Sequence, residues 1–536
     1  MSETSIPSGM SRRDFTAAAV AATAAAGLSS GAAWAQGGAR YRRHSISEPG
    51  FPRRVLDSYK KAIRAMLALP PSDPRNWYRH ALVHTIDCPH GNWWFLVWHR
   101  AYLGWFEQAC RELSGDPDFA LPYWDWTREP RVPKDMFDDV LTPTDPAYIA
   151  TFADFRKAFD GAVADLWKTA SPEQVNALLV RGLRFPADLW FDIENNPMFF
   201  DRAAARGLTP QAPDFDAATA RTVSLPTVLN ALAPRDFITF GSARTLFHSG
   251  MTGFGVLEGQ PHNRVHNCVG GFYMSPPRTG FMQDNLSPVD PVFFLHHANI
   301  DRLWDVWTRK QRGFGLPTLP TGGDLTDWSR ERFLFFTDAK GAPVTRVAAG
   351  DYAEIGPFDY DYQPGSGEEV VPRAAATAPS AAVQSFDARV TERSITAGGR
   401  AGGTVTLPAQ ALAAGAGGPA ALFATITIAQ PPIGGTHDFR VLIGDGGGPS
   451  DDTAVTLSIF GRHIMHSPVS FTVPLSPAVD SLRAANRLAA DAPLTIRVEP
   501  AGPAGSAGGH AGMRMSPRPG AAEPTPEIVS ITVQAH

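Results

Sequence analysis

Apolar residues recur at helical spacing in three long segments of the first two thirds of the chain. These segments are 55–69, 94–113 and 292–307, and Pro-rich joints separate them. After residue 384 the pattern changes to short β-branched runs between Gly, Pro and Asp clusters, which is typical of strands. The runs are 425–428, 439–443, 455–460, 469–473, 494–498 and 528–533. The expected fold class is mainly α: a helical bundle with long irregular loops, followed by a small antiparallel β domain.

These changes of pattern also predict the domain boundaries. Residues 37–362 form the expected helical domain and residues 385–536 the β domain. The stretch 363–384 is rich in Gly, Ser, Pro and Ala and reads as a linker. Two further stretches, 409–421 and 501–512, are low in complexity and are expected to be loops.

The first 36 residues resemble an export signal. Arg12 and Arg13 precede a weakly apolar, Ala-rich run over 17–26, and Ala-Trp-Ala at 33–35 gives a cleavage pattern. This arrangement resembles a bacterial twin-arginine signal and predicts a periplasmic or extracellular protein. The run is too short to anchor the chain in a membrane.

The composition argues against several classes of partner and architecture. The chain has 536 residues, which favours more than one domain, and a formal net charge of only −5. That charge does not favour nucleic acid or an anionic membrane as partner. Three cysteines are too few for a disulfide framework, and Cys110 and Cys268 are expected to be buried thiols.

Histidines gather in two places along the chain, and the first group precedes and enters the apolar segment 94–113. His80, His84, His90 and His99 fall within twenty residues. His90 and His99 are about two and a half helical turns apart, so they would point away from each other on one helix. If both bind one metal ion, His90 lies on the loop before the helix, as its Pro and Gly neighbours suggest.

The second group combines a helical pair with a later helix. His262 and His266 share one helix face and can chelate a single ion, but no Glu follows the first histidine as zinc proteases require. His296 and His297 lie about 100° apart on the next helix. His297 shares a face with Asp301, which favours His297 as the ligand.

Two sites with three neutral imidazoles each would suit a redox metal. No carboxylate stands in the ligand positions, whereas Mg²⁺ and Ca²⁺ prefer oxygen ligands. Imidazole suits copper, and three protein ligands leave each ion open to an outside molecule.

Two motifs then match a family. H-x8-H ending in W-H-R-A-Y-L at 98–103, and D-P-x-F-x-x-x-H-x-x-x-D at 290–301, resemble the two copper signatures of tyrosinases, catechol oxidases and molluscan haemocyanins. L-P-Y-W-D-W at 121–126 and Y-D-Y at 360–362 are similar to further landmarks of that family. The resemblance covers about residues 41–362 and implies two copper ions.

The resemblance also implies a ligand set. It assigns His84, His90 and His99 to the first copper and His262, His266 and His297 to the second. His80 competes with His84 for first place, but His84 lies in the Leu-Val-His segment that resembles the region of the first ligand. His80 and His296 are interpreted as structural. Cys88 stands two residues before His90, and the family implies a thioether bond between them, against the alternative of a free thiol.

The implied activity is the oxidation of phenols by O2. It comprises ortho-hydroxylation of monophenols such as tyrosine and oxidation of o-diphenols to o-quinones. Glu258 and Asn263 would hold a water that accepts the phenolic proton, although Glu258 can equally serve as a charge at a helix N-terminus. Arg100 and Asp301 are expected to pair and steady the metal helices. The alternatives are a catechol oxidase acting on diphenols alone and an oxygen carrier of haemocyanin type.

The β domain has two interpretations. It can be a lid that keeps the enzyme latent, with the strands near 439–443 over the copper site, or a stabilising module. Met274, Phe281 and Met282 are candidates for the residue that gates the second copper. Expected partners are small phenols and O2; the sequence leaves open the oligomeric state and the use of a copper chaperone.

Overall fold

The computed structural model describes most of the chain after the expected export signal. The described residues are 39–194, 199, 202–274, 277–374, 383–396, 398–414, 421–429, 438–445, 455–460, 468–489, 491–501 and 525–536. The expected signal peptide and all but the first residue of the predicted loop 501–512 lie outside them.

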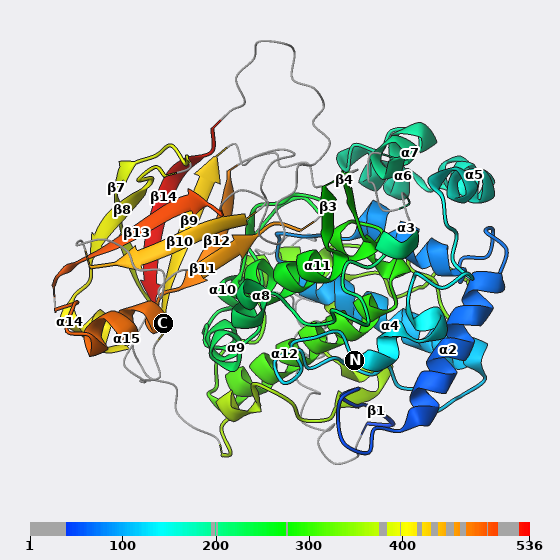
Figure 1. The fold of residues 1–536 in the computed structure, drawn as a ribbon, viewed down its shortest axis with the longest axis horizontal. Helices are drawn as coiled ribbons and strands as arrows, with labels where there is room; N and C mark the ends of the chain where they lie inside the picture. The colour runs from blue at the N-terminus through cyan, green and yellow to red at the C-terminus, as the bar shows by residue number, and fades with distance from the viewer. Residues whose placement is uncertain are drawn as a thin grey trace, which may run out of the picture.

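The expected fold class is confirmed: a helical domain stands beside a β domain (Figure 1). The α-helices of the first domain are α2 (Arg53–Ala68), α3 (Trp77–Asp87), α4 (Phe95–Ser114), α5 (Phe152–Thr169), α6 (Pro172–Val180), α7 (Pro186–Glu194), α8 (Ala217–Thr222), α9 (Leu225–Leu232), α10 (Phe237–Phe240), α11 (Asn263–Gly270), α12 (Val292–Gly313) and α13 (Gly323–Arg330). The three periodic segments therefore correspond to α2, α4 and α12.

Helices α4 and α12 form the centre of the helical domain. Both are buried on nearly all sides, which is why apolar residues surround them rather than forming a single stripe. Phe106 of α4 stacks on Phe294 of α12 with ring centroids 3.6 Å apart. α2 covers α4 with a face that includes Tyr59 and Ile63, and α4 ends at Gly115, whose φ of 67° fits a glycine helix end. A rigid pair of helices thus carries His99 and His297.

The β domain consists of two five-stranded sheets. Their orders are β11-β10-β13-β8-β7 and β2-β12-β9-β14-β6. The strands are β6 (Gln384–Asp387), β7 (Arg389–Glu392), β8 (Gly402–Thr406), β9 (Leu422–Ala429), β10 (Asp438–Gly444), β11 (Val455–Ser458), β12 (Val469–Pro474), β13 (Pro493–Pro500) and β14 (Glu527–Ala535). Every predicted run overlaps one of them, and the run 455–460 extends two residues beyond β11. The predicted loop 409–421 instead begins with helix α14 (Ala409–Ala414), and α15 (Ser476–Ala484) was not predicted.

One strand of the second sheet comes from the helical domain. β2 (Gly253–Phe254) pairs in parallel with β12, with Ser470 opposite Gly253 and Phe471 opposite Phe254. The rings of Phe254 and Phe471 stack with centroids 5.4 Å apart. The two domains therefore share backbone hydrogen bonds as well as side-chain contacts.

The beginning of the predicted linker packs against the helical domain. The backbone N–H and the hydroxyl of Ser366 both donate to Asp125, at 2.8 and 2.9 Å. Arg309 forms two hydrogen bonds of 2.8 Å with Glu368. The chain is thus fixed to this domain up to Glu368. Among the described residues, no helix combines the length and the apolar character that a membrane crossing requires.

Candidate metal centre

The first histidine cluster draws on three different pieces of chain. His84 lies near the end of α3, His90 lies on the loop that follows, and His99 lies inside α4. Their ring centroids are 5.4 to 5.8 Å apart, and all three rings are buried. The predicted placement of His90 before the helix and His99 within it is what the structure has. The loop lets the two rings converge although they stand nine residues apart.

The second cluster draws on two neighbouring helical segments. His262 ends a π-helical turn (Glu258–His262), His266 lies in α11, and His297 lies in α12. Their ring centroids are 4.6 to 5.3 Å apart. π-turns inside helices often occur at functional sites because they re-aim a side chain.

The two clusters face each other. His99 stacks on His297 with centroids 4.1 Å apart, and His90 stacks on His262 at 5.7 Å. In each cluster one nitrogen or sulfur per residue lies within 4.8 Å of the others, the first including Cys88 and the second His296. Six buried imidazoles thus surround one common space.

Hydrogen bonds fix the ring orientation of four of these histidines. The Nδ1 atoms of His84, His99 and His266 contact the carbonyls of Asn285, Phe95 and Met282 at 2.6 to 2.7 Å. That of His262 contacts Asn263 Oδ1 at 2.8 Å. Because these partners only accept, each Nδ1 carries the proton and each Nε2 presents a lone pair. Such bonds orient ligand imidazoles in metal sites.

The free nitrogens fit a metal ion. The Nε2 atoms of His84 and His262 are buried and have no hydrogen-bond partner among the described residues. Burial lowers the pKa of His99 and of His266 to about 3, so both rings are neutral, as a metal ligand must be. His266 Nε2 lies 3.1 Å from His297 Nε2. A copper ion is the kind of group that would satisfy such buried lone pairs.

His296 differs from His297 in its tautomer. The indole N–H of Trp126 can only donate, and it lies 3.1 Å from His296 Nδ1. Nδ1 of His296 is therefore the acceptor, and in the neutral ring Nε2 carries the proton. That Nε2 is buried without a described partner. A protonated Nε2 does not bind a metal ion, which agrees with the prediction that His297 rather than His296 is the ligand.

His80 points away from the metal cluster. Its ring packs edge-on against Phe106, with centroids 5.3 Å apart, and burial lowers its pKa to about 4. It is absent from the histidine group that includes His84. The geometry thus agrees with the preference for His84 as first ligand.

Cys88 lies beside His90. Its Sγ is 3.6 Å from Nδ1 and 3.7 Å from Nε2 of that ring, and 3.4 Å from Nε2 of His99. The sulfur is therefore in contact with the His90 ring and nearly equidistant from its two nitrogens. Burial raises the pKa of the thiol well above its usual value. Cys110 is buried, as expected, whereas Cys268 is only partly buried.

Glu258 and Asn263 flank His262, but no hydrogen bond joins them among the described residues. Glu258 accepts from the N–H of Gly91 at 2.8 Å and from the hydroxyl of Ser242. Burial raises its pKa to about 8. Asn263 holds the His262 ring and donates from Nδ2 to the carbonyl of Ser458 at 2.6 Å.

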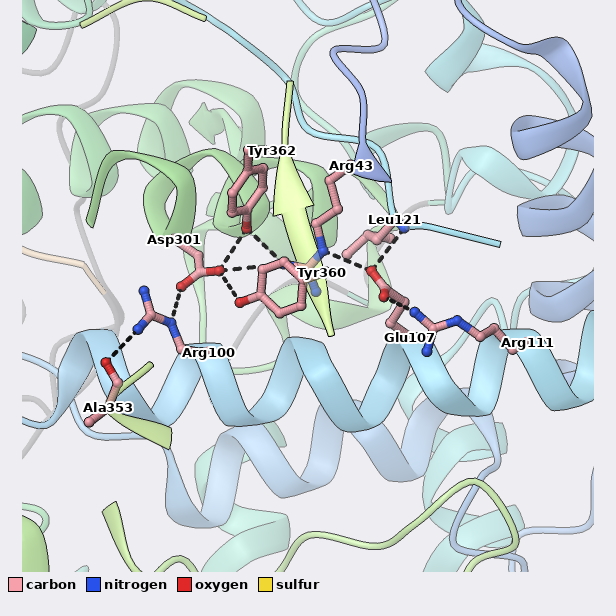
Figure 2. Close-up of polar contacts among 9 residues, drawn as sticks. All are labelled: Arg43, Arg100, Glu107, Arg111, Leu121, Asp301, Ala353, Tyr360 and Tyr362. Atoms are coloured by element: carbon pink, nitrogen blue, oxygen red, sulfur yellow. Dashed lines mark hydrogen bonds and ion pairs between the residues drawn. The ribbon is translucent and has the colours of Figure 1, made fainter. Parts of the chain in front are cut away.

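A buried carboxylate ties the two metal helices together (Figure 2). Asp301, one turn after His297, accepts from Arg100 Nε at 2.6 Å and from the hydroxyl of Tyr362 at 2.7 Å. Tyr360 and Arg43 complete its shell. Burial alone would raise the pKa of Asp301, but Arg100 and Arg43 hold it below the usual value. The expected pairing of Arg100 with Asp301 is confirmed.

The network continues along α4 (Figure 2). Arg43 Nε donates to Glu107 at 2.8 Å, and Glu107 accepts from the backbone N–H of Leu121 at 2.9 Å. The Glu107 carboxylate therefore joins α4 both to the β1 strand (Tyr41–Arg43) and to the segment 121–126 that the sequence marked as a family landmark.

The β domain reaches the histidines, as the lid interpretation expected, but through a residue that the sequence did not single out. The ring of Phe460 lies 4.0 Å from that of His266 and 5.0 Å from that of His90, measured between centroids. Asn267 Nδ2 donates to the carbonyl of Ile459 at 3.3 Å. The segment over the site thus follows β11 and is not the predicted 439–443. Phe460 was part of a predicted strand, and no local pattern distinguishes it from a core residue.

Two further side chains hold the loop between His84 and His90. Arg181 donates to the carbonyls of Thr85 and Cys88 at 3.0 and 2.7 Å. His248 Nε2 lies 2.6 Å from the carbonyl of Asp87. A helix C-terminus leaves carbonyls without partners, and these side chains satisfy three of them. Neither residue belongs to a recognisable motif, so the sequence could not reveal this role.

Comparison with known proteins finds similarity to tyrosinases and polyphenol oxidases. Residues 69–310 match the family model described as the common central domain of tyrosinase. The chain is 28% identical over 331 residues to a chloroplastic polyphenol oxidase of Vitis vinifera, covering 58% of this chain and 46% of that protein. It is 25% identical over 350 residues to tyrosinase HcTyr1 of Hahella sp. (strain CCB-MM4), covering 58% of this chain and 61% of the other.

Solved structures extend the likeness in fold to the β domain. Latent apple tyrosinase superposes with a TM-score of 0.55 at 19% identity, covering 94% of this chain and 98% of that one. A latent aurone synthase, a polyphenol oxidase, gives a TM-score of 0.56 at 18% identity and covers 94% and 90%. In sequence, the chain spans about half the length of the curated relatives it matches.

Proposed function

We propose, from the premise that residues 69–310 are a tyrosinase-family domain, that this protein is a dicopper oxidase that uses O2 to oxidise phenols. The observation that carries the proposal is the pair of buried three-imidazole clusters that face each other. His84, His90 and His99 would hold one copper, and His262, His266 and His297 the other. The copper pair would supply the binding and reduction of O2.

The substrates are monophenols and o-diphenols, and the chain's own residues orient them. The buried imidazoles around the site, among them the stacked rings of His90 and His262, favour a flat aromatic molecule. Glu258 and Asn263 flank His262, and we assign to them the water that takes the phenolic proton. Glu258 also stands at the start of the helical turn, so both of its expected roles are compatible with its position.

A paired assay tests this function. Copper-loaded protein should hold two copper ions per chain and oxidise both L-tyrosine and L-dopa. Oxidation of L-dopa alone would make the protein a catechol oxidase. Reversible O2 binding without turnover would make it a carrier of haemocyanin type, and a single copper per chain would reject the dicopper proposal.

We also propose that Cys88 and His90 become joined by a thioether bond. The sulfur is in contact with the His90 ring, 3.6 and 3.7 Å from its two nitrogens. Bond formation removes the S–H hydrogen and the ring C–H hydrogen as two protons, and two electrons pass to O2. Mass spectrometry of the peptide containing both residues should show the loss of two hydrogens, and Cys88→Ser should abolish that loss.

The β domain is proposed to keep the enzyme latent. Phe460 packs on histidines of both clusters and occupies the place where a substrate ring would stack. Phe460→Gly should therefore raise L-dopa oxidation in the intact chain, whereas Phe471→Leu, in the shared sheet, should not. Equal activity of wild type and Phe460→Gly would contradict the lid and favour a stabilising module.

Export is proposed on the sequence of residues 1–36, which lie outside the described part. Replacing Arg12 and Arg13 by Lys should retain the protein in the cytoplasm of a bacterial host. Secretion of that variant at the level of the wild type would contradict a twin-arginine signal.

A further inference from the structure

A cavity lies beside α3 and α4, the helices that carry His84 and His99. It has a volume of about 140 Å³ and lies between α3 and α4 on one side and α5–α7 and residues 334–337 on the other. Its walls include Val83, Ile86, Phe106 and Leu166. An apolar cavity of roughly 150 Å³ is large enough to bind one benzene ring. The size therefore matches a single six-membered aromatic ring.

Arg79 brings a positive charge to this cavity. It lines the wall, it is partly buried, and its Nη1 donates to the carbonyl of Ala162 at 3.3 Å. It forms no salt bridge within the part of the chain that the structure describes. Burial lowers the pKa of its guanidinium, and no carboxylate counteracts that effect. A guanidinium in this state favours a carboxylate partner.

His80 adds a neutral polar group next to Arg79. The side chain is buried and lines the same cavity, and its Nε2 has no hydrogen-bond partner among the described residues. Because the ring is neutral, one nitrogen donates and the other accepts. Buried polar groups normally have partners, so a ligand that supplies one accounts for this exception.

The cavity is separate from the histidine clusters. None of the six histidines assigned to copper lines it, whereas Tyr102 does, with its ring centroid 6.4 Å from that of His80 and 6.4 Å from that of His84. The tyrosine hydroxyl donates to the carbonyl of His80 at 2.9 Å. A molecule in this cavity thus contacts Tyr102 and His80 rather than the histidines assigned to copper.

We propose that this cavity binds a small aromatic carboxylate. The ring occupies the apolar part, and the carboxylate pairs with Arg79 and hydrogen-bonds to the His80 ring. An empty cavity of this size forfeits packing, and a partly buried arginine without a counter-ion adds a desolvation cost. One ligand removes both penalties. The proposal does not depend on copper or on phenol oxidation.

The test is calorimetric titration of the copper-loaded full chain with sodium benzoate and with benzyl alcohol, followed by a crystal structure with benzoate. Val83→Phe should fill the cavity and abolish binding there. Arg79→Met should weaken benzoate by about tenfold and leave benzyl alcohol within about twofold, because only the charge pair is lost. Val175→Phe, on the exposed face of α6, is the control and should bind both as wild type does.

Benzoate binding at the metal centre instead of the cavity would have the same affinity in all these variants. The crystal structure shows which of the two places the benzoate occupies. Unchanged benzoate affinity in both Val83→Phe and Arg79→Met, or density for water alone in the cavity, would overturn the proposal. If Val83→Phe fails to fold, Leu166→Phe fills the cavity from α5. A failed benzoate test leaves the copper and phenol assays untouched, so the two proposals are judged separately.

Discussion

The two histidine clusters are built by different means. In the second cluster, His262 and His266 lie one turn apart on consecutive helical residues, so the spacing of the chain almost fixes their relation. In the first, His90 is carried by a loop whose backbone is held by Arg181 and His248. Local sequence thus suffices for two of the three ligands in the second cluster, whereas the loop of the first depends on residues more than ninety positions away.

The largest expected effect tests the ligand choice within the second cluster. His297→Asn should remove one of the two coppers and reduce L-dopa oxidation to background, because only three imidazoles hold that ion. His296→Asn should retain both coppers, since Trp126 makes its Nδ1 an acceptor and leaves Nε2 protonated. Copper analysis of both variants decides. Loss of copper from His296→Asn alone would reverse the assignment.

The next effect concerns the carboxylate that serves both clusters. Asp301→Asn should lower the free energy of unfolding by about 3–5 kcal/mol, because it leaves the buried Arg100 without its salt-bridge partner and Arg43 with Glu107 alone. Thermal and urea unfolding measure this loss. Asp305→Asn, one turn further, is the control: its partner Arg309 is partly exposed and keeps Glu368, so its loss should be smaller. Equal losses in the two variants would contradict a special role of Asp301 in joining α4 and α12.

A smaller effect should separate the first cluster from the second. Arg181→Met leaves the carbonyls of Thr85 and Cys88 without this donor and should lower the free energy of unfolding by about 1.5–3 kcal/mol. It should also weaken copper at the first site by about 10–100-fold, as loss of an orienting partner does. Arg184→Met, whose side chain is 67% exposed, is the control. Uniform weakening of both coppers would contradict a role restricted to the first cluster.

The smallest effect depends on pH. His248 lies 3.0 Å from Glu331 and 3.4 Å from an Asp87 oxygen. Burial alone would lower its pKa, but these carboxylates raise it above the usual value. The stabilisation by His248 is therefore full below the unfolded pKa and declines as pH rises through the folded one.

Melting temperatures of wild type and His248→Gln should differ most near pH 5 and least near pH 9. Arg181 also faces Asp87 and remains charged over this range, so it does not produce the trend. A difference that grows with pH would contradict stabilisation by a protonated His248 between Glu331 and Asp87.

The sequence predicted what helical periodicity and short motifs can encode. It predicted α2, α4 and α12, the position of His90 on a loop and the pairing of Arg100 with Asp301. It missed β6 to β8, whose residues 384–406 contain few β-branched runs, and it read α14 as a loop because Ala and Gly dominate that stretch. The contacts of Phe460, Arg181 and His248 join segments that are distant in the sequence, so no local pattern predicts them.

The short strand β2 bears on how the protein would respond to a protease. Its residues belong to the helical domain, yet they hydrogen-bond to β12 as the edge of the other domain's sheet. A cut in the connecting segment would sever the covalent link and leave this noncovalent one intact. Both fragments should then elute together from a sizing column until a denaturant separates them, and a nicked sample would still look whole under native conditions.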